Sequence, residues 1–253
     1  MGATGAQMKS ASVCNGIDCE STILCEAHVI PRGFGRFTRG RHHNVILTME
    51  TTRTTPQLGI FDTELLCADC DNSLGAFDDV LIEAAVHFRR LHQNNGPIWS
   101  LPSIPPEQFA KGLFAILWRA SLSKRADFQN FSLGAFENDV KEILFGRAEF
   151  ADRPHISLLV QRYTSKSFDA SRFYLTPSLA PFMGLSAGGL SLAGFRFLAK
   201  FDRRPLNSAF QPFDVTRCGI VRGTYLEIEK TPEFKKISTL VVADLLRSKK
   251  KTS

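Results

Sequence analysis

The fold is decided around residues 67–72, which read Cys67-Ala68-Asp69-Cys70-Asp71-Asn72. Two cysteines at this spacing can place both thiolates on one tetrahedral metal ion, as in half of a zinc-knuckle site. Downstream of the pair, apolar residues recur at steps of three and four from Phe77 to Phe88, a spacing that predicts an amphipathic helix. The segment therefore predicts a helix that begins at a metal site.

The remaining ligands of this ion have to come from upstream cysteines. Five of the six cysteines fall within the first 70 residues, and such clustering favours metal binding over a disulfide framework in a cytosolic chain. Because Cys25 lies on a predicted strand beside His28, we expect it to be packed in the core. We therefore assign Cys14, Cys19, Cys67 and Cys70 as ligands of a structural Zn²⁺. The alternatives are a site that uses Cys25, and ordinary buried thiols.

Composition limits the class of protein. The 43% hydrophobic and 22% charged residues are ordinary for a globular protein, and no apolar run is long enough to suggest a membrane span. Residues 1–10 do not resemble a signal peptide, so we expect a cytoplasmic protein with no membrane partner. The net charge of +6 and the pI near 9.1 suit a nucleic-acid partner. Four arginines in one segment are candidate phosphate contacts, the alternative being a solvated loop: Arg32, Arg36, Arg39 and Arg41.

The coarse organisation of the chain has a break between residues 94 and 106, which is rich in Asn, Gly and Pro. We place a domain boundary there, giving domains at residues 1–95 and 96–253. In the first domain we expect a short strand ending at Pro31, then a long loop over residues 32–60 with one short strand at 45–47. The second domain should contain helices at 107–123, 133–145 and 233–246 and strands at 156–163, 172–175, 192–201, 219–221 and 225–228.

The motifs of the first domain resemble a known family. The cysteines, the Glu26-Ala27-His28-Val29-Ile30-Pro31 strand and the Cys67–Asn72 segment look like an HNH (ββα-metal, His-Me finger) endonuclease with a four-cysteine zinc centre. The resemblance covers residues 14 to about 90, about a third of the chain. It implies an α+β fold: a small zinc-bound ββα-metal module, followed by a helical segment and an antiparallel β-rich C-terminal domain.

The same resemblance implies roles for individual residues. His28 corresponds to the general base that deprotonates the attacking water, a task that suits imidazole because its pKa lies near neutrality. Asp71 falls at the position of a ligand to the catalytic divalent ion, and a carboxylate suits Mg²⁺ or Mn²⁺. Asp62 falls at the middle position, which helps to orient the histidine loop. The expected activity is metal-dependent hydrolysis of phosphodiester bonds, with DNA as the expected substrate and host defence or mobile-element biology as a setting.

Two departures from the family pattern keep an alternative open. The residue before the histidine is Ala27, where the family often has a metal ligand, and Asp62 replaces the usual asparagine. Glu26 and Asp78 are the candidates for the missing oxygen ligand. The alternatives are a non-catalytic zinc-containing nucleic-acid-binding module, and a subunit that docks onto a larger effector complex.

The second domain carries no second catalytic set. The glycine-rich residues 184–189 lack the Gly-Lys-Ser/Thr ending of a phosphate-binding loop, so we interpret them as a turn between strands. Trp118-Arg119 on the 107–123 helix is expected to pack in the core, the alternative being a contact with the nuclease module or with nucleic acid. Target selection, partner binding and regulation are all open roles for this domain.

Overall fold

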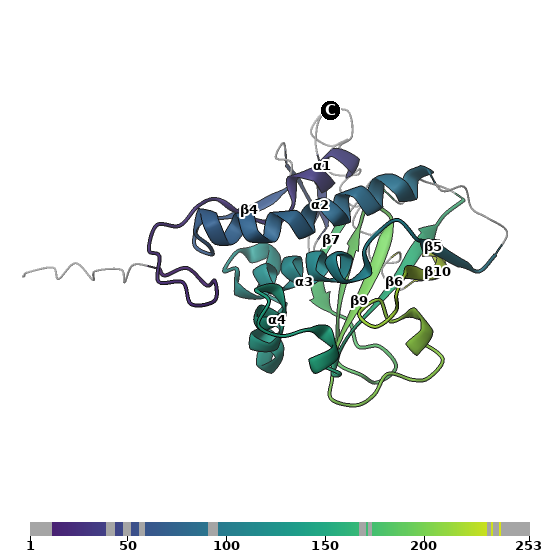
Figure 1. Cartoon of the computed structure of the whole chain (residues 1–253). Helices are drawn as coiled ribbons and strands as arrows, with labels where there is room; N and C mark the ends of the chain where they lie inside the picture. The colour runs from purple at the N-terminus through teal and green to yellow at the C-terminus, as the bar shows by residue number, and fades with distance from the viewer. Residues whose placement is uncertain are drawn as a thin grey trace, which may run out of the picture.

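Helix α3 (Pro106–Leu122) lies at the centre of the computed structural model, between helix α2 (Ala68–Arg90) and a large β-sheet (Figure 1). Phe109 and Phe114 contact Phe197 and Phe201 of the sheet, and Gly112 faces α2. The residues of α3 are apolar and buried on almost every side of the helix, which is typical of a helix in the core. The structure describes residues 12–38, 44–47, 52–55, 59–90, 96–166, 171, 174–231, 234 and 238.

Within these residues the large sheet has the strand order β3-β2-β7-β8-β9-β6-β10-β5. Neighbouring strands are antiparallel except for the parallel pairs β2–β7 and β6–β10. The strands are β2 (Asn44–Leu47), β3 (Thr52–Thr55), β5 (Ile98–Leu101), β6 (Ile156–Thr164), β7 (Tyr174–Leu179), β8 (Ala187–Leu192), β9 (Phe195–Phe201) and β10 (Val221–Glu227).

A separate two-stranded sheet and three helices complete the described elements longer than one turn. Strand β1 (Ala27–Ile30) pairs antiparallel with β4 (Ile60–Asp62), and α2 follows β4 along the chain. Helix α1 (Arg32–Thr38) follows β1, and α4 (Glu137–Leu144) packs on α3. Most buried apolar residues from Cys14 to Val221 belong to one hydrophobic core, and two smaller clusters include Tyr163 and Leu159.

This arrangement confirms the predicted α+β class with its antiparallel-rich sheet. The predicted helix at 107–123 and strand at 156–163 agree with α3 and β6 to within one residue at each end. Of the predicted helix at 133–145, residues 137–144 form α4, after a short 3₁₀ turn. Residues 91–95, at the predicted domain boundary, and most of the predicted helix at 233–246 lie outside the described residues.

Several sequence predictions about local structure are wrong. Residues 187–189 belong to β8 instead of a turn, and the predicted strands at 219–221 and 225–228 are one strand, β10. Residues 32–38 form α1 instead of a loop, because Phe34 is buried and Gly33 lies directly against Ile82 of α2. Packing stabilises this short helix, which its glycines would otherwise disfavour. The predicted strand at 192–201 is divided by a tight turn in which Ala193 and Gly194 both have positive φ, the geometry of a two-residue hairpin.

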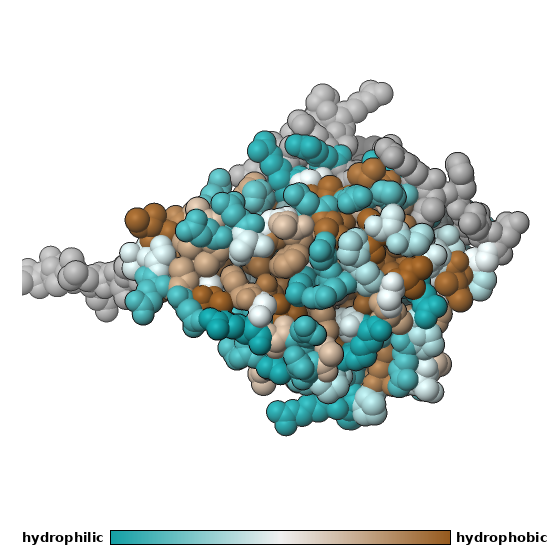
Figure 2. Space-filling model, in the orientation of Figure 1, coloured by the Kyte–Doolittle hydropathy of each residue, from teal (hydrophilic) through white to brown (hydrophobic). Residues whose placement is uncertain are grey.

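None of the helices in the described part of the chain is long and apolar enough to cross a membrane. Figure 2 shows hydrophilic and hydrophobic residues intermixed over the face that carries α2 and α3. Among the described residues, the exposed large apolar side chains are Val13, Ile23, Ile98, Leu179 and Met183.

Gly112 sets the distance between α2 and α3, and this gives a first prediction. A Cβ at this position would lie 2.5 Å from the backbone oxygen of Phe77 and 2.7 Å from Leu81. We expect Gly112→Ala to lower the free energy of unfolding. Overpacking costs about 1–3 kcal/mol, whereas the higher helix propensity of alanine stabilises the helix by only about 1 kcal/mol. Chemical denaturation measures the difference.

Gly75→Ala on α2 is the matched control, since a Cβ there would meet nothing within 4 Å. This variant should be as stable as the wild type or more stable. Equal stability of the two variants would contradict the close approach of the helices at Gly112.

Candidate metal centre and the adjoining pocket

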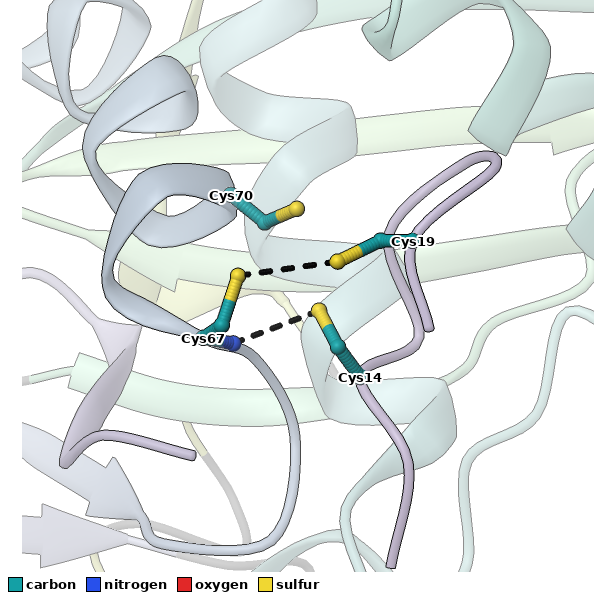
Figure 3. Close-up of side chains that lie close together, drawn as sticks. All are labelled: Cys14, Cys19, Cys67 and Cys70. Atoms are coloured by element: carbon teal, nitrogen blue, oxygen red, sulfur yellow. Dashed lines mark hydrogen bonds between the residues drawn. The ribbon is translucent and has the colours of Figure 1, made fainter. Parts of the chain in front are cut away.

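Four cysteine side chains converge between the N-terminal loop and the first turn of α2 (Figure 3). Their Sγ atoms all lie within 4.8 Å of one another, and those of Cys19 and Cys67 are 3.7 Å apart. A tetrahedral ion with Zn–S bonds of about 2.3 Å requires S···S separations of roughly 3.8 Å. The cluster is therefore compatible with a structural zinc site, and its members are the four that the spacing selects: Cys14, Cys19, Cys67 and Cys70.

Backbone hydrogen bonds hold the N-terminal loop against the start of α2. The amide of Cys25 donates to the oxygen of Leu66, and the backbone and side-chain amides of Asn15 both donate to the oxygen of Leu65. Cys25 itself is half-buried and packs against the core, outside the four-sulfur cluster. These bonds place the Cys14–Cys19 loop opposite Cys67 and Cys70.

The surroundings of the sulfurs favour a thiolate at Cys67 and oppose thiolates at Cys14 and Cys70. The Sγ of Cys14 accepts hydrogen bonds from the amides of Gly16 and Cys67, at 3.4 and 3.2 Å. The backbone amide of Cys70 lowers the pKa of Cys67 to about 7, whereas burial raises the pKa of Cys14 and Cys70. Four thiolates this close together repel one another, so a bound cation is the natural way to stabilise all four.

His28 lies on β1, and the pocket that it lines also includes Asp71, the residue after Cys70. His28 pairs with Phe61 across the β1–β4 ladder, and the two ring centroids are 4.5 Å apart. Its Nε2 atom is buried and has no hydrogen-bond partner. Burial lowers the pKa of His28 below its ordinary value, despite the nearby Asp71 carboxylate, so the ring is neutral at pH 7 and can accept a proton.

A pocket of about 510 Å³ opens over the N-terminal half of α2. Its lining includes His28 from β1, Arg32 from α1, and Asp71 and Asp78 from α2. The Oδ1 atom of Asp71 is buried without a hydrogen-bond partner, as is Nε2 of His28. Burial raises the pKa of Asp71, and the opposing influences are the Arg119 guanidinium, His28 and the His28 amide. Two orphaned polar atoms in one pocket fit a polar or ionic ligand.

The oxygens of this pocket suit a hard divalent cation. Asn72 and Asp79 also line it, both exposed, so the lining offers amide and carboxylate oxygens in addition to those of Asp71. Asp78 lines it too, but its Oδ1 accepts a 2.6 Å hydrogen bond from Arg119.

Of the other described residues that were predicted for the site, Arg32 lines this pocket, whereas Glu26, Asp62 and Arg36 do not. Ala27 is fully buried, Glu26 is exposed and is not among the lining residues, and Asp62 pairs with Ala27 at the end of β4. The two carboxylate oxygens of Asp62 accept hydrogen bonds from the Ser123 hydroxyl and the Glu64 amide. Arg32 and Arg36 are exposed on α1, while Arg39 and Arg41 lie outside the described residues.

Three residues at the end of α3 and just after it contact this region, and only one of them is noticeable in the sequence. Ser123 bonds to Asp62, Arg125 donates to the Phe61 oxygen at 2.9 Å, and Arg119 reaches α2. The sequence marks only Arg119, as an arginine within an otherwise apolar helix. Such a residue requires a buried partner, but sequence spacing does not identify it.

Comparisons of the chain with protein-family models, with curated proteins and with solved structures give no match.

Gly16 leads to a prediction about the cluster. A Cβ at this position would lie 2.3 Å from the Sγ of Cys70, so no side chain fits beside the sulfurs. We expect Gly16→Ala to weaken zinc binding about tenfold or more, the scale of changes next to metal ligands. Competition with a chromophoric zinc chelator measures the affinity.

The matched control is Gly219→Ala, because a Cβ there would meet nothing within 4 Å. Its zinc affinity should equal that of the wild type. Unchanged zinc binding in Gly16→Ala would contradict the arrangement of the four sulfurs.

Proposed function

We propose that this chain is a metal-dependent endonuclease of the HNH (ββα-metal) type that hydrolyses phosphodiester bonds, with DNA as the substrate. The observation that carries the proposal is the pair of orphaned atoms, His28 Nε2 and Asp71 Oδ1, in one pocket beside the four-cysteine cluster. The antiparallel β1–β4 pair followed by α2 is the ββα arrangement that this chemistry uses. In this proposal the cluster holds a structural Zn²⁺.

The proposed reaction assigns one role to each side chain. His28, neutral because its pKa is lowered, takes a proton from a water molecule at Nε2 as the water oxygen attacks phosphorus. The bond from phosphorus to the leaving oxygen breaks, and that oxygen gains a proton from solvent. Asp71 would hold Mg²⁺ or Mn²⁺, which supplies charge stabilisation at the phosphate and the leaving oxygen.

The charge around the pocket supports a polyanionic substrate. Arg32 lines the pocket and is exposed at the start of α1, and Arg36 is exposed one turn later. Guanidinium groups form paired hydrogen bonds with phosphate oxygens, so these two residues would hold the backbone of the nucleic acid. Arg39 and Arg41 extend the same basic segment in the sequence.

A second candidate function is nucleic-acid binding without cleavage. Ala27 offers no ligand atom, and both Asp62 oxygens are occupied by hydrogen bonds, so Asp62 has little freedom to orient the histidine. Glu26 is exposed and is not among the lining residues, and therefore does not replace the missing ligand. DNA binding with a steep salt dependence and no cleavage under Mg²⁺ or Mn²⁺ would favour this candidate.

The test of the nuclease is cleavage of plasmid and single-stranded DNA by the zinc-loaded chain with Mg²⁺, Mn²⁺ or EDTA. We expect metal-dependent cleavage by the wild type, and a rate lower by about 10²–10⁴ in His28→Ala, the usual contribution of a general base. Zinc content and thermal unfolding should stay the same.

His87→Ala is the matched control, because His87 is partly exposed on α2, paired with Glu83 and outside the pocket lining. It should cleave at the wild-type rate. Equal loss in the two variants, or His28→Ala with normal cleavage, would contradict the role of His28.

The pH dependence follows from the direction of the pKa shift. Burial and the Arg119 and Arg32 charges lower the pKa of His28 below its ordinary 6.5, against the Asp71 and Asp78 charges. A base has to be deprotonated, so the cleavage rate should be constant at high pH and fall as pH drops through this lowered pKa. At pH 6.5 the rate should exceed half of its plateau. A midpoint above pH 6.5 would show that another group, or an unshifted histidine, limits the reaction.

A further inference from the structure

Arg119 is an almost completely buried charge on α3, with only 1% of its side chain exposed. Its Nε atom donates to the backbone oxygen of Ala115 in its own helix, at 3.2 Å. Its two terminal nitrogens both turn to α2: Nη2 donates to Asp78 Oδ1 at 2.6 Å, and Nη1 lies 3.7 Å from Asp71 Oδ1. One guanidinium therefore spans two carboxylates on one face of α2.

The two contacts are unequal, and the difference assigns different roles to the carboxylates. Asp78 is buried and strongly hydrogen-bonded to the arginine, as a buried charge requires. Asp71 lies within ion-pair distance, yet its Oδ1 makes no hydrogen bond. The arginine thus holds Asp78 through a hydrogen bond, whereas Oδ1 of Asp71 is in a looser ion pair and has no hydrogen bond.

We propose that Arg119 is a positioning residue for the His28 pocket, anchored by Asp78 and orienting the Asp71 carboxylate toward the divalent ion. The proposal rests on the proposed function and extends it. Asp78 acts as the anchor of the arginine and is not a ligand of the ion. The second half of the chain gains a definite role, because α3 supplies a residue that the ββα arrangement lacks.

The packing of α3 is suited to this task. Gly112 lies two turns before Arg119, on the same side of the helix, where it allows contact with Phe77 and Leu81. The guanidinium of Arg119 has little conformational freedom, because it is hydrogen-bonded to its own helix and to Asp78 and because the two helices pack closely at Gly112. Lysine could replace the charge but has no planar fork with which to span two carboxylates.

The experiment measures Mn²⁺ binding to the full-length, zinc-loaded chain by electron paramagnetic resonance, alongside zinc content and thermal unfolding. The variants are Arg119→Lys, the neutral double variant Arg119→Met/Asp78→Asn, and Asp71→Asn. The double variant removes both charges of the tight pair, so no unpaired charge is left buried. Arg119→Lys serves as the second test should the double variant not fold.

We expect the Kd for Mn²⁺ to be about five- to tenfold higher in Arg119→Lys and in the double variant, with zinc content unchanged. Removing a residue that positions a metal ligand lowers metal affinity on this scale. A Kd within twofold of wild type in either folded variant would overturn the positioning role, and would make Arg119 a purely structural partner of Asp78. Asp71→Asn tests the proposed function separately. Mn²⁺ binding that is unaffected by this change would overturn the metal site itself.

Discussion

The contact between the N-terminal loop and the first turn of α2 is carried by four sulfur atoms within 4.8 Å of one another. Residues 14–19 and 67–70 are far apart in the sequence, so this contact closes a long loop. It fixes the position of β1, which follows the loop, relative to α2. His28 on β1 and Asp71, next to Cys70, are thereby brought to the same pocket.

Helix α3 supports the opposite side of the same arrangement. Its glycine allows α2 to approach closely, its arginine reaches the α2 carboxylates, and the residues at its end contact β4. The four-cysteine cluster and the buried Arg119–Asp78 ion pair therefore fix α2, which forms one wall of the pocket, at two points. The residues that line the pocket all lie between His28 and Ile82, and α3 supports them through its contacts with α2 and β4.

The sequence predicts the parts of this structure that depend on local pattern. The spacing of Cys67 and Cys70 marks a metal half-site, and the expected packing of Cys25 on its strand selects Cys14 and Cys19 as the other ligands. Apolar periodicity identifies α2 and α3, because this signal lies within short segments. Helix α1 was not predictable in this way. It is stabilised by the burial of Phe34 and by the contact of Gly33 with Ile82 of α2, which exist only in the folded chain. The partner of Arg119 could not be predicted either, because α2 and α3 meet only in the folded chain.

We propose that the four cysteine thiolates bind one zinc ion and so hold the His28 pocket together. X-ray absorption at the zinc edge of the purified chain tests it most directly. We expect one zinc per chain with four sulfur neighbours at about 2.3 Å. A chain purified without zinc, or zinc bound by fewer than four sulfurs and by nitrogen or oxygen, would contradict it.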